Sequence, residues 1–129
     1  MYKNGAISWS SKKIKIVCLS TTEAETVGAT HAALDVKYVR NLMMDIGIVL
    51  KRPIPFLLDS SGTFGYVRHQ SAKQRTKYFD LWVTFVRAAY RGLTIQPHLI
   101  TTGTMVADIF TKALPKNETL KFRNFMMNA

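Results

Sequence analysis

The chain has 129 residues, of which 47% are apolar and 20% are charged, a composition that suits one globular domain with a hydrophobic core. Eighteen Lys and Arg against eight Asp and Glu give a net charge of +10, which favours a polyanionic partner such as nucleic acid over the alternative of a merely soluble basic domain. The single cysteine, Cys18, excludes an internal disulfide and a Cys-rich zinc site. Without a membrane-length apolar stretch or a signal-peptide core, we expect an intracellular protein of the cytoplasm or nucleus, with no membrane partner.

The first expected element is a β-strand at residues 5–11, where Ile7 and Trp9 alternate with serines. A long helix follows from the capping-box sequence Ser20–Glu23 to Gly47, which suits the position just after a helix end. On a helical wheel, most of its surface is apolar or small, which predicts deep packing against other elements such as a sheet. Its polar positions form one narrow stripe: Thr26, Thr30, Lys37, Arg40 and Asn41.

The second half of the chain alternates between short apolar runs and helical patterns. Residues 56–58 form an apolar strand that ends at Asp59, and residues 60–70 carry no clear pattern. A helix is expected at residues 80–91, and a strand follows it, interrupted by Pro97. Another helix runs from Thr104 to about Leu114, before a last amphipathic helix. This alternation predicts a layered α/β domain.

Three of the eight acidic residues stand at the ends of expected elements. Glu25 lies in the first turn of the long helix, on its apolar side, Asp59 ends a strand, and Asp108 lies early in a late helix. If tertiary folding brings them together, they form an oxygen-rich site suited to Mg²⁺ and to phosphodiester hydrolysis. Spacing alone favours plainer roles: Glu25 and Asp108 would stabilise helix N-termini, and Asp59 would cap the following segment.

A basic segment lies between the short strand at residues 56–58 and the helix expected at residues 80–91. It contains Arg68, Lys73, Arg75 and Lys77, with Tyr78 beside them. Such a segment can hold a phosphate backbone and stack on a base or sugar, and we expect it to bind nucleic acid. The alternative is a solvated loop with no ligand.

Several blocks of sequence together resemble one known family. The runs at residues 5–13, 19–25 and 29–33 are similar to the start of the ribonuclease H region in copia-type retrotransposon Pol polyproteins. Residues 75–80 are similar to that family's R-T-K-H-x-D segment, and residues 105–115 to its V-A-D-I-x-T-K-x-L-P ending. The blocks occur in the family's order and cover essentially the whole chain.

The resemblance implies a ribonuclease H-like fold, with a mixed sheet flanked by helices, in a single partial domain at residues 1–129. Members of the family hydrolyse the RNA strand of RNA–DNA hybrids with Mg²⁺ held by four acids. Carried over by position, Glu25, Asp59 and Asp108 would be catalytic metal ligands. The expected partners are RNA–DNA hybrid or other nucleic acid, and the upstream reverse transcriptase region of the parent polyprotein.

The chain also departs from the family's pattern. The family's first two strands, the first of which bears a catalytic Asp, come before the point at which this chain starts, so we expect a fold that lacks them. The motif Asp-Asn-Gln-Ser-Ala reads Asp-Ser-Ser-Gly-Thr at residues 59–63. Thr26 stands where an aromatic residue is usual, and Tyr78 where His is usual. The acidic loop before the last motif reads Thr-Gly-Thr at residues 102–104.

Three functions remain open at this stage. The chain is a hydrolytic domain whose missing Asp comes from an upstream segment, an inactive basic module that binds nucleic acid, or a remnant of a transposon without function. We expect the fragment alone to be catalytically impaired, because two-metal chemistry needs its full set of carboxylates.

Overall fold

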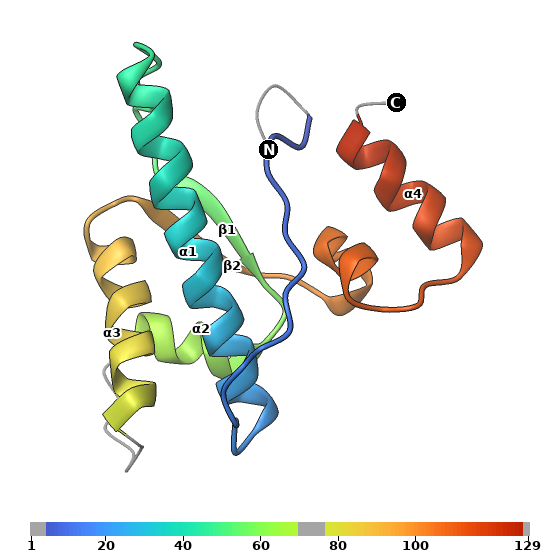
Figure 1. Cartoon of the computed structure of the whole chain (residues 1–129), viewed down its shortest axis with the longest axis horizontal. Helices are drawn as coiled ribbons and strands as arrows, with labels where there is room; N and C mark the ends of the chain where they lie inside the picture. Colours follow the sequence, from blue (N-terminus) through green and yellow to red (C-terminus); the bar gives the residue numbers. More distant parts are fainter. Residues whose placement is uncertain (1–4, 70–76, 128–129) are drawn as a thin grey trace. The chain divides into compact units, whose positions relative to one another are not determined.

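The computed structural model describes residues 5–69 and 77–127 of the chain. The described residues form an α/β structure with four α-helices and a two-stranded parallel sheet (Figure 1). The chain divides into two compact units. Unit 1 combines residues 1–13 with residues 102–129, and unit 2 consists of residues 14–101. The mixed α/β class is confirmed, whereas a single partial domain stays a prediction.

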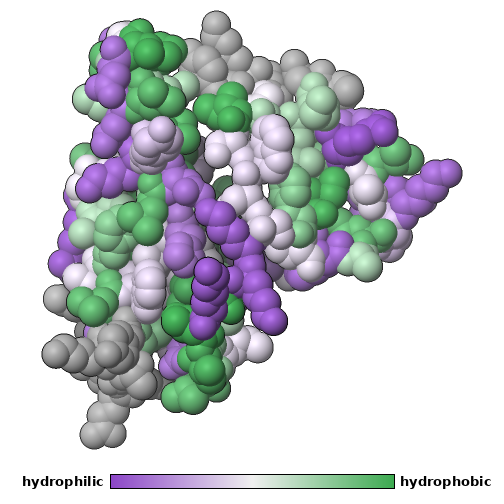
Figure 2. Space-filling view, viewed as in Figure 1, coloured by the Kyte–Doolittle hydropathy of each residue, from purple (hydrophilic) through white to green (hydrophobic). Residues whose placement is uncertain are grey.

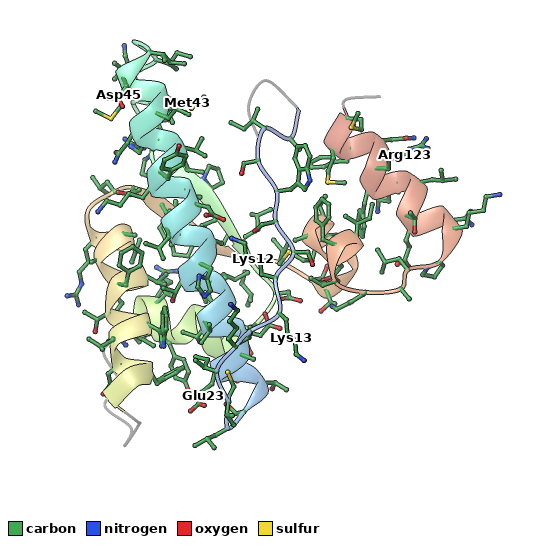
Figure 3. All side chains as sticks on the ribbon, in the orientation of Figure 1. Lys12, Lys13, Glu23, Met43, Asp45 and Arg123 are labelled. Atoms are coloured by element: carbon green, nitrogen blue, oxygen red, sulfur yellow. The ribbon has the colours of Figure 1, made fainter. Side chains whose placement is uncertain are left out.

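Helix α1 (Thr21–Asp45) begins and ends as its sequence predicts. The Ser20 hydroxyl accepts a hydrogen bond from the backbone N–H of Glu23, at 3.1 Å. The Glu23 carboxylate accepts from the N–H of Leu19 at 2.7 Å, one residue earlier than a standard capping box. At the other end Gly47 has φ +82°, the left-handed conformation that glycine adopts at low cost. Figure 3 shows Glu23 and Asp45 at the two ends of the helix.

The buried face of α1 differs from the prediction. Thr26 and Thr30, at the start of the predicted polar stripe, are 0% and 2% exposed. Each hydroxyl donates to the carbonyl four residues earlier, so its hydrogen-bonding potential is satisfied without water. Several large apolar side chains of the helix are instead exposed: Leu34, Tyr38, Leu42 and Met44. Figure 2 shows hydrophobic surface at the C-terminal end of α1. The prediction of deep packing on nearly all sides is therefore wrong.

Strands β1 (Ile54–Leu58) and β2 (Ile95–Leu99) pair in parallel, with Ile54 opposite Ile95. Pro97 lies inside β2, although the sequence suggested that it interrupts the strand. The alternation of the ladder explains why it fits. The bond from Ile54 N–H to Thr94 C=O and the bond from Ile100 N–H to Leu58 C=O direct the even-numbered residues of both strands toward the partner strand. The backbone nitrogens of Pro55 and Pro97 therefore point to the two outer edges of the sheet, where the ladder needs no N–H donor.

Two helices connect β1 to β2. Residues 61–68, unassigned from the sequence, form α2 (Ser61–Arg68), and α3 (Lys77–Arg91) begins three residues earlier than predicted. The three helices of unit 2 pack on one face of the sheet, where the buried strand residues point. Their common core contains Ala29, Ala33, Phe56, Leu58, Val67, Val86 and Ile95.

The strand predicted at residues 5–11 does not form. Beyond a bridge residue at Gly5, residues 6–19 contain no helix or strand, and Trp9 is 67% exposed. A strand is stable only when its backbone groups pair with a neighbour. In unit 1, Ala6 N–H donates to Met126 C=O, and the Ser11 hydroxyl donates to Phe110 C=O. Isolated bonds of this kind hold the segment in place without making a ladder.

Unit 1 also contains the last part of the chain. The helix predicted from Thr104 to Leu114 is replaced by two short 3₁₀-helices at Thr102–Thr104 and Val106–Phe110. The β-branched residues of the second, Val106 and Ile109, lower the α-helical propensity of so short a segment. Helix α4 (Lys116–Met127) confirms the last amphipathic helix and buries Phe122, which is 3% exposed.

Candidate functional site

Glu25 lies on the exposed side of α1, one turn from the helix start. The sequence placed it on an apolar face, where a carboxylate would be costly to bury. Gly28 and Ala32, which share that face, are also exposed. The buried residues of this part of α1 are Thr26, Val27 and Ala29, and Glu25 is not among them. Glu25 can reach solvent and, with it, a ligand.

Asp59 directly follows β1 and is half-buried. The sequence left open that Asp59 caps the next segment, but the neighbouring Ser60 has that role. The Ser60 hydroxyl accepts from the N–H of Thr63 at 3.2 Å and begins α2. The carboxylate of Asp59 thus lies at the carboxyl end of a parallel strand, where ligands commonly bind in α/β sheets.

The segments that carry Glu25 and Asp59 pack directly against each other. The hydroxyls of Thr26 on α1 and Thr63 on α2 lie 3.2 Å apart, and both residues are fully buried. A Cβ added to Gly62 would lie 2.7 Å from the Cγ2 atom of Thr22, so the two helices approach closely at this point. The contact lies within four residues of each acid along the chain. Unit 2 therefore brings these two segments to one place.

Asp108 belongs to unit 1 and lies in the 3₁₀-helix Val106–Phe110. It is 8% exposed and is one of the buried polar residues of the chain. Its Oδ2 atom accepts from the Lys112 ammonium at 2.8 Å, which forms an ion pair one turn apart. Pairing of this kind offsets the cost of removing a carboxylate from water.

The three carboxylates are divided between the two units. Glu25 and Asp59 lie in unit 2 and Asp108 lies in unit 1, so their convergence stays a prediction. Within either unit, the described residues contain no group of three or more His, Cys, Asp or Glu side chains that could hold a metal ion.

The basic segment is only partly described. Arg68 is exposed at the end of α2, with its guanidinium carbon 5.5 Å from the centre of the Phe64 ring. Lys73 and Arg75 lie outside the described residues. Lys77 and Tyr78 belong to the first turn of α3, and their side chains also lie outside the description. Their binding role stays a prediction.

Two arginines hold backbone segments in ways that the sequence did not reveal. The Arg87 guanidinium donates to the carbonyls of Tyr66, at 2.6 Å, and His69, at 2.5 Å, and so fixes the chain where the basic segment begins. Arg40 donates to the carbonyls of Leu50, at 2.9 Å, and Arg52, at 3.3 Å. Neither has a sequence signal, because the acceptors are backbone groups brought near by folding.

The described residues contain no helix that is both long and apolar enough to cross a membrane.

Comparison with known proteins gives a consistent result. The chain is 30% identical over 117 residues to the "Retrovirus-related Pol polyprotein from transposon TNT 1-94" of Nicotiana tabacum. It is 29% identical over 119 residues to each of the Pol polyproteins from transposons RE1 and RE2 of Arabidopsis thaliana. These alignments cover 91% to 92% of this chain.

The chain is a distant homologue of copia-type retrotransposon Pol polyproteins.

The homology concerns one short region of these Pol polyproteins. The chain spans 8% to 9% of the length of the relatives it matches. No protein-family model matches the chain, and no solved structure matches it. The resemblance to copia-type Pol polyproteins is thereby confirmed, and the ribonuclease H assignment within them belongs to the proposal below.

Proposed function

We propose that this chain is a ribonuclease H-like segment of a retrotransposon Pol polyprotein, that it binds nucleic acid, and that it does not hydrolyse RNA by itself. Its preferred ligand would be an RNA–DNA hybrid or another duplex, bound through phosphates. The basic segment that includes Arg68 would form part of the surface.

The observation that carries the proposal is the homology over nearly the whole chain, combined with the charge. Alignment to Pol polyproteins covers at least 91% of the residues, and the net charge is +10. A charge excess of this size attracts phosphates whatever the fold, and a retrotransposon polyprotein offers a context in which nucleic acid is the natural ligand.

The parallel strands and the helices between them support the ribonuclease H-like part of the proposal. Asp59 ends a buried strand, and the segment after it packs against the α1 turn that bears Glu25. Glu25 and Asp59, which the resemblance matches to acids of the family, thus lie on adjoining segments, and this supports the proposal of a shared site.

The proposal includes no magnesium site formed by unit 2 alone. The resemblance implies four carboxylates, and unit 2 contributes two of the three that this sequence offers, Glu25 and Asp59. The third, Asp108, lies in unit 1, where its Oδ2 atom accepts a hydrogen bond from the Lys112 ammonium. Hydrolysis by two metal ions is therefore no part of the function proposed for this chain alone.

The test combines binding and cleavage in one assay. Purified protein is mixed with a labelled RNA–DNA hybrid in the presence of Mg²⁺, beside a Glu25→Gln, Asp59→Asn variant. We expect both proteins to bind the hybrid, seen as a band of lower gel mobility, and to leave its RNA strand uncleaved. Magnesium-dependent cleavage by the wild type that disappears in the variant would show that the chain is an active nuclease. Absence of binding at low salt would reject the nucleic-acid function.

A further inference from the structure

Five cations lie on segments that meet near the amino ends of the two strands, whereas Asp59 follows the carboxyl end of β1. These segments are one turn of α1, the connection before β1 and the last turn of α3. We call the five cations the Arg40 cluster, with the members Lys37, Arg40, Lys51, Arg52 and Arg91. All of its members except the half-buried Arg40 are exposed.

Hydrogen bonds show that these separate segments meet. Arg40 donates to the carbonyls of Leu50 and Arg52, which ties α1 to the connection that carries the basic side chains. Ile54 N–H then donates to Thr94 C=O at 3.0 Å, which ties that connection to the turn after Arg91. The cluster is therefore set by topology: the Arg40 turn of α1 and the end of α3 each contact or precede the start of a strand.

Among the described residues, no carboxylate forms an ion pair with the cluster. Asp35, on the same helix, is about 160° around the helix axis from Lys37. Arg91, in the last turn of α3, is partly explained by the helix dipole. The helix dipole does not explain Lys37 and Arg40, because both lie before the last turn of α1, which contains no basic residue.

From this arrangement we infer that the Arg40 cluster is a second phosphate-binding surface, one that holds the backbone of a duplex nucleic acid. The inference rests on the proposed function and adds a contact surface to it. Arg40 acts as a positioning residue: its guanidinium is used by backbone carbonyls, and it fixes the connection from which Lys51 and Arg52 reach solvent. A backbone-directed surface of this kind binds without sequence preference.

The experiment compares two variants of equal charge by anisotropy of a labelled RNA–DNA hybrid. The cluster variant is Lys37→Gln, Lys51→Gln, Arg52→Gln and Arg91→Gln. The control variant is Lys12→Gln, Lys13→Gln, Lys15→Gln and Lys116→Gln, which removes four exposed lysines elsewhere. Each variant lowers the net charge from +10 to +6, because four cations are removed (10 − 4 = 6). Circular dichroism and thermal melting verify that both variants fold.

We expect the cluster variant to bind about tenfold more weakly or worse. The plot of the logarithm of its binding constant against the logarithm of salt concentration should become less steep, by about 0.9 for each phosphate that the variant no longer neutralises. The control should be weakened much less. Equal weakening of both variants would show that binding follows net charge alone and would overturn the inference. A cluster variant that binds as tightly as the wild type would also overturn the inference. In both cases, binding by the wild type would still support the proposed function. Absence of binding by the wild type would reject both.

A charge-preserving variant isolates the positioning role. Arg40→Lys keeps the positive charge but cannot span both carbonyls with a planar fork. We expect it to weaken binding severalfold in the wild-type background and to have little effect in the cluster variant. Equal effects in both backgrounds would contradict a role that acts through Lys51 and Arg52.

Discussion

The hydroxyl oxygens of Thr26 on α1 and Thr63 on α2 lie 3.2 Å apart in the interior of unit 2. Both positions depart from the pattern of the family that the sequence resembles, which has an aromatic residue at the first and Ala at the second. The Thr26 hydroxyl donates to Thr22 C=O at 2.7 Å, so it is free to accept from Thr63. The two positions thus contact each other in the interior. Two threonines of intermediate size stand there in place of the large aromatic residue and the small Ala of the family's pattern.

Removal of either hydroxyl should destabilise unit 2 by a measurable amount. Thr26→Val and Thr63→Val preserve shape, and each removes the hydrogen bond between the two hydroxyls, at a cost of about 1 kcal/mol. The double variant should cost less than the sum, because that shared hydrogen bond is lost only once. Urea unfolding of the four proteins gives the coupling energy. Strict additivity would mean that the two hydroxyls do not interact.

Glycine substitutions in α2 should have opposite effects three residues apart. Gly62→Ala places a Cβ 2.7 Å from Cγ2 of Thr22, and the resulting overlap should destabilise the protein by about 1–3 kcal/mol. Gly65→Ala is the matched control, because no atom lies within 4 Å of its added Cβ. It should be neutral or stabilise the helix by up to about 1 kcal/mol. Thermal melting of both variants tests the close approach of α1 and α2, and a stabilising Gly62→Ala would contradict it.

The Asp108–Lys112 pair should act as a unit in the stability of unit 1. Lys112→Met leaves a carboxylate that is mostly buried without its ammonium partner, and we expect a loss of about 1–3 kcal/mol. Asp108→Asn in the same chain should recover part of that loss, since a neutral amide needs no counter-ion. Chemical denaturation of both single variants and the double variant gives the comparison. If the Lys112→Met variant is as stable as the wild type, the pair is unimportant.

Much of unit 2 could be predicted because its signals are local. The Ser20–Glu23 cap and Gly47 define α1 from short-range hydrogen bonds and from one backbone conformation. The apolar run before Asp59 likewise gives β1. Such features depend on neighbouring residues in the chain, which a sequence displays directly.

The errors concern features that depend on distant partners. Residues 5–11 have a strand pattern, but a strand also needs a neighbour, and the pattern does not reveal whether one is present. Burial of Thr26 depends on Thr63, which is 37 residues away. For the candidate site, the sequence named three acids whose convergence stays a prediction, and the four-residue spacing of Asp108 and Lys112 is visible in it. It gave no sign of the Arg40 cluster, which forms only when folding brings separate segments together.

The central claim is that this chain binds nucleic acid through phosphates, and a salt titration tests it most directly. Affinity for a labelled RNA–DNA hybrid is measured by anisotropy from low to physiological salt. We predict that the logarithm of the binding constant falls linearly with the logarithm of salt concentration, by orders of magnitude if several phosphates are contacted. No binding at low salt, or an affinity that salt does not change, would contradict the claim.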